Sequence, residues 1–123
     1  MPKREVYLEI IEGPYKGQRF DFSDHHTFTI GRGSDCTVCL KKDTALSRRH
    51  LLFVIDGVKV RIRDLGSLNG TSVNGQPVYN SRGKDSASAP PPEWIGNGDY
   101  ITIGSTKMVV HIHATVDDVE WAG

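Results

Sequence analysis

Val58-Lys59-Val60-Arg61-Ile62-Arg63 alternates strictly between apolar and basic side chains. Successive side chains of a β-strand point to opposite faces, so this segment places valine and isoleucine on one face and lysine and arginine on the other. A strand of this kind belongs to a sheet that has one face in the core and the other in water. The stretch therefore predicts a two-layered β-protein.

The same period of two extends through most of the chain, and no window shows a helical stripe. Turn-forming pairs separate the alternating segments at short intervals, for example Asp56-Gly57, Asn69-Gly70 and Asn74-Gly75. Many short strands joined by frequent turns favour an antiparallel β-sandwich. Eight segments fit strands: Val6–Ile11, Gln18–Phe22, Thr27–Ile30, Thr37–Leu40, Leu51–Ile55, Val58–Asp64, Tyr100–Ile103 and Met108–Ile112.

The length and the net charge of the chain argue against several classes of function. The chain has 123 residues, enough for one buried core, and its 15 basic and 15 acidic residues cancel. A neutral chain gives no long-range attraction to nucleic acid or to an anionic membrane, and no apolar run reaches the ~20 residues that span a bilayer. The first residues lack the apolar core of a signal peptide. We expect a cytoplasmic, monomeric protein that binds neither nucleic acid nor membrane.

One stretch breaks the alternation. Asn80 to Pro92 is polar and ends in three prolines, a composition that cannot bury enough apolar surface to order itself. We therefore expect a single domain over residues 1–123 with a core at about 5–114. A flexible insertion is expected at about 80–93 and a short C-terminal tail at 115–123.

Two cysteines, Cys36 and Cys39, have the C-x-x-C spacing of redox pairs and of half zinc sites. They fall on a short predicted strand, and no second pair of this kind is present. His111 and His113 share a face of a late strand. We interpret the cysteines as reduced thiols, at least one of them packed as a small apolar side chain.

Three polar and basic clusters lie between predicted strands, where a sandwich core cannot use them. They are Gly31-Arg32-Gly33-Ser34, Ser47-Arg48-Arg49-His50 and Gly66-Ser67-Leu68-Asn69-Gly70-Thr71. Together they supply guanidinium groups, hydroxyls, a side-chain amide and turns rich in backbone N–H, the components of a site for an oxyanion carried by a peptide. An enzyme is a weaker interpretation. Ser47 and His50 have neither a nucleophile elbow nor a third orienting acid, and the chain lacks a nucleotide-binding P-loop.

The order and spacing of these clusters resemble the forkhead-associated (FHA) family: G-R, then S-x-x-H, then S-x-N-G-T-x-V-N-G, which ends at Gly75. The segment from Gly98 to Gly104 is similar to the last strands of the family. The resemblance implies a β-sandwich of about eleven short strands with the binding site on loops at one end. It also implies phosphothreonine-dependent peptide binding in Ser/Thr kinase signalling, with no catalysis, cofactor or metal.

The resemblance assigns roles residue by residue. Arg32 pairs with the phosphate, Ser47 donates its hydroxyl to it, and Arg48 adds a further phosphate contact. Asn69 hydrogen-bonds the main chain of the ligand, Leu68 contributes through its backbone, and Ser67 is either a ligand contact or a loop brace. The loop at 42–46 lies where the family reads the third residue after the phosphothreonine.

The remaining site residues support the loops. His50 is expected to brace them through hydrogen bonds, and the others provide backbone geometry: Gly31, Gly70, Thr71, Asn74 and Gly75. The alternative function is a scaffold domain that binds proteins through the same sandwich without phosphate. A departure from the motif at Arg32, Ser47 or Asn69 would favour that alternative, and all three are present.

Overall fold

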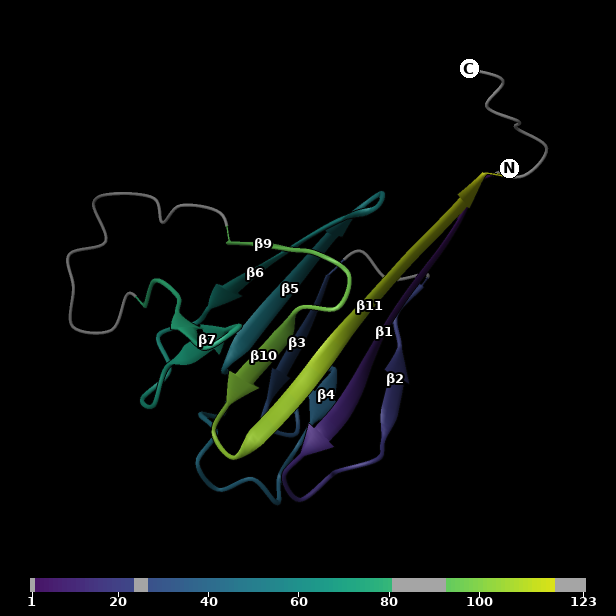
Figure 1. The fold of residues 1–123 in the computed structure, drawn as a ribbon. Coiled ribbons are helices and arrows are strands. Elements are labelled where there is room, and N and C mark those ends of the chain that lie inside the picture. Colours follow the sequence, from purple (N-terminus) through teal and green to yellow (C-terminus); the bar gives the residue numbers. More distant parts are fainter. Residues whose placement is uncertain (1, 24–26, 81–92, 117–123) are drawn as a thin grey trace.

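Two β-sheets packed face to face form the protein (Figure 1). The computed structural model describes residues 2–23, 27–80 and 93–116. Their eleven strands are β1 (Pro2–Glu12), β2 (Arg19–Asp21), β3 (Thr27–Gly31), β4 (Val38–Cys39), β5 (Leu51–Asp56), β6 (Lys59–Asp64), β7 (Thr71–Val73), β8 (Gln76–Pro77), β9 (Glu93–Ile95), β10 (Tyr100–Ile103) and β11 (Thr106–Val116). The predicted all-β sandwich of about eleven short strands is confirmed. Within those ranges there is no helix that could cross a membrane.

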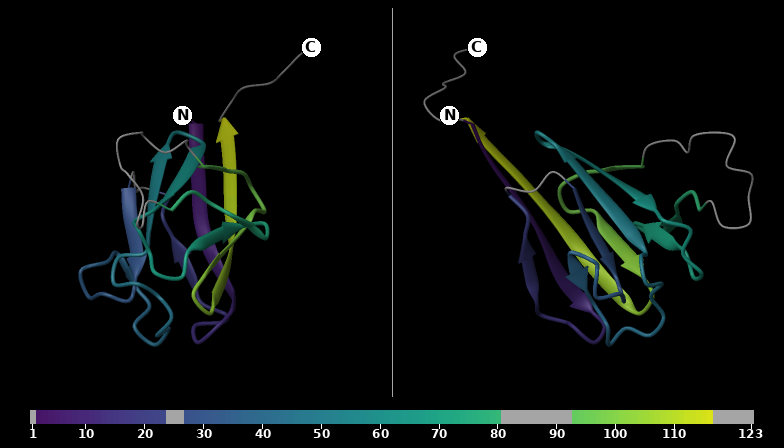
Figure 2. Two further views of the ribbon diagram at one scale, coloured as in Figure 1. Left: turned by 90° about the vertical axis from the view of Figure 1, so that its left-hand side faces the viewer. Right: turned by 180° about the vertical axis from the view of Figure 1, so that it is seen from behind.

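The longest strand pairing, between β1 and β11, lies in the six-stranded sheet. The six-stranded sheet has the order β2-β1-β11-β10-β7-β8, and the five-stranded sheet has the order β4-β3-β5-β6-β9. The two layers are seen edge-on in Figure 2. Every described pairing is antiparallel except that of β3 with β4, which is parallel and only two residue pairs long. The prediction of an antiparallel sandwich therefore holds for all but this short bridge.

The core lies between the sheets and follows the predicted alternation. In β6, Val60 and Ile62 are buried while the basic residues that alternate with them are exposed. Phe28 stacks between Phe22 and Phe53, with ring centroids 3.6 Å and 4.6 Å away. Asp64 is the exception to the pattern, because this acid occupies a buried position at the end of β6.

Three strands were not predicted: β7, β8 and β9. Each has only two or three residues, too few for a period to stand out, and β8 contains a proline. They form because β10 and β6 offer them partners, for example Ile101 opposite Val73 and Val60 opposite Ile95. Cross-strand pairing that depends on distant residues cannot be read from a short local pattern.

The expected domain limits differ from the strand ends. β1 and β11 pair from Pro2 opposite Val116, so the ladder extends beyond the expected core of 5–114 and into the expected tail at 115–123. Most of the expected insertion at 80–93 falls on residues 81–92, which lie outside the described residues, as do 117–123. At its two ends, Asn80 donates a hydrogen bond to the Ser67 carbonyl and Glu93 begins β9.

Candidate functional site

Three loops meet at one end of the sandwich, and each carries one of the clusters. The first loop is residues 32–37, the second is residues 40–50 and the third is residues 65–70. Backbone hydrogen bonds join the first two: Arg32 N–H donates to the Ser47 carbonyl at 3.0 Å and Gly33 N–H to the Arg48 carbonyl at 2.9 Å. Residues that are far apart in the sequence are thereby brought together.

Gly31 makes this close approach possible. A Cβ atom at this position would lie 2.2 Å from the backbone oxygen of Arg48. Since real Cβ atoms do not come so near, any larger residue would push the first two loops apart. The expected geometric role of Gly31 thus has a specific cause, which is the passage of the second loop across the end of β3.

Arg32 is exposed, and one of its nitrogens holds the rest of the side chain in place. Its Nε–H donates to the Leu46 carbonyl at 3.0 Å. No described residue pairs with its two terminal amino groups, which are the part of a guanidinium that grips a phosphate in a fork. The side chain is therefore anchored on one edge and has donors for an anion on the other.

Ser47 is half-buried beside Arg32. Its Oγ accepts a hydrogen bond from the Leu68 N–H at 2.9 Å, which ties the second loop to the third. Because the oxygen acts as acceptor in that bond, the hydroxyl proton is left to donate elsewhere. The Leu68 N–H is thus occupied by Ser47, and the Leu68 side chain is 67 % exposed at the rim.

His50 is fully buried below the loops. Its Nδ1 accepts from the Ser47 N–H at 3.2 Å, and its Nε2 lies 2.8 Å from the Gly70 carbonyl. The backbone N–H can only donate and the carbonyl can only accept, so the ring is neutral with its proton on Nε2. The geometry is that of a brace between the second and third loops.

Asp64 organises the third loop, and the sequence analysis missed it. Its carboxylate accepts from the Ser67 N–H and Oγ–H, both at 2.7 Å, and from Thr71 Oγ–H at 2.6 Å. The Ser67 oxygen in turn accepts the Gly70 N–H at 3.0 Å. The signal was present, because Asp64 falls on the buried phase of the β6 alternation, where an acid needs partners.

This network distinguishes between the two roles expected for Ser67, a ligand contact or a loop brace. Its side chain is 0 % exposed and its hydroxyl is used on both sides within the loop. A peptide at the surface cannot reach it, so Ser67 is a loop brace. Thr71, which is also buried, shares this bracing role.

Asp43 is a second buried acid that the sequence analysis missed. Its carboxylate accepts from the Ala45 N–H at 3.1 Å, the Ser105 N–H at 2.9 Å and Thr106 Oγ–H at 2.6 Å. The second loop is thereby fixed to the turn between β10 and β11. Ser105 and Thr106 are 62 and 63 residues away in the sequence, so no local pattern could have indicated these two contacts.

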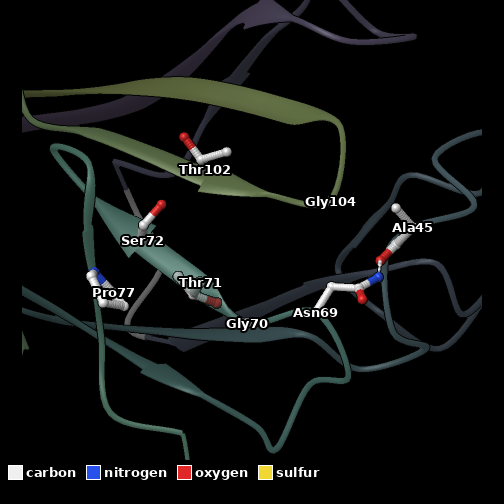
Figure 3. Close-up of a pocket in the computed structure, with 8 residues that line it drawn as sticks. All are labelled: Ala45, Asn69, Gly70, Thr71, Ser72, Pro77, Thr102 and Gly104. Atoms are coloured by element: carbon white, nitrogen blue, oxygen red, sulfur yellow. Dashed lines mark hydrogen bonds between the residues drawn. The ribbon is translucent and has the colours of Figure 1, made fainter.

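Asn69 is exposed and spans two loops. Its Nδ2 donates to the Ala45 carbonyl at 2.8 Å, as drawn in Figure 3. Beside this bridge is a pocket of about 320 Å³. Its lining consists of small or polar side chains and backbone: Ala45, Asn69, Gly70, Thr71, Ser72, Pro77, Thr102 and Gly104. The pocket continues from the loops onto the end of β7 and β10.

The hairpin of β7 and β8 turns at Asn74 and Gly75, whose φ values are 51° and 83°. Two successive positive φ values are the mark of a type I′ hairpin turn, which asparagine followed by glycine favours. Asn74 also pins the hairpin to β10, because its N–H donates to the Tyr100 carbonyl and its Oδ1 accepts the Tyr100 N–H. Both residues shape the turn of this hairpin, which belongs to a different segment of the chain from Arg32.

The two thiols support the arginine loops. Cys36 donates to the Arg48 carbonyl at 3.0 Å, and Cys39 lies 3.5 Å from the Arg32 carbonyl. Burial raises the pKa of the Cys36 thiol, which therefore stays protonated as a donor. Within the described part of the chain, no group of three or more metal-ligating side chains is present.

Arg49 belongs to a different contact. Its guanidinium pairs with Asp35 on the surface, and that hydrogen bond holds the pKa of the carboxyl below its usual value. Arg48, in contrast, is exposed and forms no side-chain bond with any described residue. Arg49 is therefore paired with an acid, whereas the guanidinium of Arg48 has no side-chain partner among the described residues.

A sequence profile of the FHA domain matches residues 28–104, more than half of the chain and all three loops. The chain belongs to the FHA domain family. It is 36 % identical over 118 residues to the glycogen accumulation regulator GarA of Mycolicibacterium smegmatis, covering 96 % of this chain and 66 % of GarA. The chain spans about two thirds or less of the length of the curated relatives that it matches.

Solved FHA domains have the same fold. One, from a study of phosphothreonine-dependent FHA interactions, has 31 % identity and a TM-score of 0.70, over 89 % of this chain and 97 % of that one. The kinase-interacting FHA domain of the Arabidopsis kinase-associated protein phosphatase has 28 % identity and a TM-score of 0.75, over 95 % and 100 %. FHA domains bind phosphothreonine peptides and act as binding or regulatory modules.

Proposed function

We propose that this FHA domain recruits a phosphothreonine-containing protein through its three loops and has no catalytic activity. The observation that carries the proposal is the pairing of Arg32 with Ser47. Arg32 is fixed by the Leu46 carbonyl while its terminal amino groups have no partner among the described residues, and Ser47 keeps its hydroxyl proton beside it. A charged fork and a hydroxyl donor held by the same two loops suit a phosphate monoester.

The other contacts extend the site from phosphate to peptide. Arg48 supplies a second cation at the rim. Asn69 uses one amide hydrogen to bridge to Ala45, which leaves its oxygen and its other hydrogen for a peptide main chain. The neighbouring pocket at Ser72 and Thr102 provides a path for residues beyond the phosphothreonine.

His50 argues against catalysis. Its Nδ1 is bonded to the backbone N–H of Ser47 and not to the Ser47 hydroxyl, and its Nε2 proton is given to Gly70. Both ring nitrogens are occupied, so neither can take the Ser47 proton as a general base would. The proposed role is a monomeric, cytoplasmic adaptor in Ser/Thr kinase signalling that uses no cofactor, nucleic acid or membrane.

Calorimetric titration with a phosphothreonine peptide, and with the same peptide unphosphorylated, tests the proposal. The phosphorylated form should bind with a micromolar Kd, about −8 kcal/mol. Arg32→Ala should cost about 2–5 kcal/mol of affinity, because it removes a charge-assisted contact, with little change in thermal stability. Arg49→Ala, which removes a neighbouring charge already paired with Asp35, is the matched control. Equal binding of the unphosphorylated peptide, or parental affinity in Arg32→Ala, would contradict the proposal.

A further inference from the structure

The solvent face of the five-stranded sheet carries a row of cations between apolar side chains. Lys59, Arg61 and Arg63 alternate outward along β6. On the strands at either side, Val54 lies opposite Arg61 in β5 and Trp94 lies opposite it in β9. The basic face is defined here by these residues together with Leu52, which lies opposite Arg63.

The cations of the basic face are unpaired. No described residue forms an ion pair or hydrogen bond with the side chains of Lys59, Arg61 or Arg63. Among the described residues one acid, Asp56, shares the face, and it lies opposite Lys59 at the far end of the row. In a chain whose charges cancel, the middle of this face is a local excess of positive charge.

Its apolar part is exposed as well. Trp94 is 56 % exposed, although tryptophan is usually found packed in a core or an interface, and Leu52 and Val54 are half-buried. Directly opposite side chains of an antiparallel pair have Cβ atoms only about 5 Å apart, so Arg61 lies between Val54 and Trp94. Arginine and tryptophan are the residues most enriched at binding hot spots.

The basic face begins next to the third loop of the proposed phosphopeptide site. Arg63 immediately precedes Asp64, whose carboxylate holds the third loop. From Arg63 to Lys59 the row extends four residues, about 13 Å, away from the loops. An extended segment of about ten residues, with a reach of roughly 33 Å, could therefore connect a bound phosphothreonine with Arg61.

We propose that the basic face docks an acidic segment with apolar side chains from the same protein that presents the phosphothreonine. Carboxylates would pair with Arg61 and Arg63 while an apolar side chain covers Trp94 and Val54. Three cations flanked by apolar side chains suit a short polypeptide better than a nucleic-acid backbone, which needs a longer charged track. This inference rests on the proposed function, because the phosphothreonine contact brings the second segment to a high effective concentration.

The test compares three synthetic peptides: a short phosphothreonine peptide, the same peptide joined by a Gly-Ser linker to a Glu/Leu segment, and a version with Gln in place of Glu. The segment is attached in turn to either end. At low salt, the parent should bind the Glu version at least tenfold more tightly than the short peptide, and the Gln version should lose most of this gain. Equal affinities for short and Glu peptides in both orientations would overturn the proposal.

Arg61→Glu and Lys16→Glu make the same charge change at different places, since Lys16 is exposed on the turn between β1 and β2. Both variants should bind the short peptide like the parent, which shows that the phosphothreonine site is intact. Arg61→Glu should bind the short and Glu peptides within twofold of each other, while Lys16→Glu should keep the gain. A gain that survives Arg61→Glu would overturn the proposal even if phosphothreonine binding holds.

A second measurement does not depend on phosphothreonine. The unlinked Glu/Leu segment, added at millimolar concentration, should shift the amide NMR signals of Val54, Arg61 and Trp94 in the parent protein. Larger effects of a phosphatidylserine vesicle or of a single-stranded oligonucleotide on the same signals would contradict a polypeptide partner. Absence of shifts with the peptide segment would contradict the basic face as a docking site.

Discussion

Replacing His50 by alanine tests whether the loops depend on the buried imidazole. The change leaves the Ser47 N–H and the Gly70 carbonyl without their partners. Each buried group left unsatisfied costs about 1–3 kcal/mol, and two groups lose their partners here. Because water entering the cavity recovers part of this cost, we expect the free energy of unfolding to fall by about 2–4 kcal/mol. For a domain of this size that is a decrease in Tm of roughly 8–15 °C.

Two conservative variants separate the contributions of the two hydrogen bonds of His50. An asparagine at position 50 can place an oxygen near the position of Nδ1 and accept from Ser47, while a glutamine can reach toward Gly70 in place of Nε2. His50→Asn and His50→Gln should therefore melt between the parent and His50→Ala. Phosphopeptide affinity should decrease in the same order, because the two bonds hold the loops that carry Arg32, Ser47 and Asn69.

Calorimetric melting and peptide titration of the same samples test the effects of His50 on stability and on phosphopeptide affinity. Arg49→Ala is the stability control, since it removes only an exposed ion pair that is worth well under about 1 kcal/mol. If His50→Ala melts like that control, the bracing role is refuted. If it melts early but binds at parental affinity, the braced loops are not the loops that bind.

Three further outcomes are expected. Asp64→Asn should lower unfolding free energy by about 1–3 kcal/mol in urea denaturation, because an amino group then faces two hydroxyls that now donate to the carboxylate; an unchanged midpoint would count against the network. Gly31→Ala should destabilise by about 1–3 kcal/mol and weaken binding through the clash with Arg48, whereas Gly96→Ala, whose Cβ would meet only the Asp99 carboxylate at an ordinary contact distance of 3.7 Å, should do neither. Phosphothreonine affinity should fall between pH 7.5 and 5.5, since the second phosphate pKa is about 6 and the dianion is the better ligand; a flat profile in titrations would contradict this.

Sequence and structure agree most closely where side chains act within a local pattern. The alternation in β6 predicted which face is buried, and the turn residues at Asn74 and Gly75 indicated a tight hairpin that their φ values bear out. The bracing role expected for His50 came from the family resemblance and not from a local pattern. The hydrogen bonds that make His50 a brace reach Ser47 and Gly70, three and twenty residues away.

The features that the sequence did not predict depend on contacts between distant segments. Asp43 meets Ser105 and Thr106, which lie 62 and 63 residues further along the chain. Ser67 looked suited to either of two roles because a serine in a loop can turn outward or inward, and the direction is set by the buried carboxylate of Asp64. The contacts of the peptide with Arg32, Ser47, Arg48 and Asn69 remain predictions that the proposed titrations test.

The ladder between β1 and β11 determines how the domain responds to tension. Pro2 lies opposite Val116, while the other end of β11 turns at Ser105, beside the second loop. A force applied at Pro2 and Val116 separates the strands at right angles to their length, parallel to the hydrogen bonds, so the bonds break one after another as in a zipper. Opening would therefore begin at the end remote from the loops and advance toward them. A domain pulled at both ends would unfold at low force, and the loops that bind the ligand would open last.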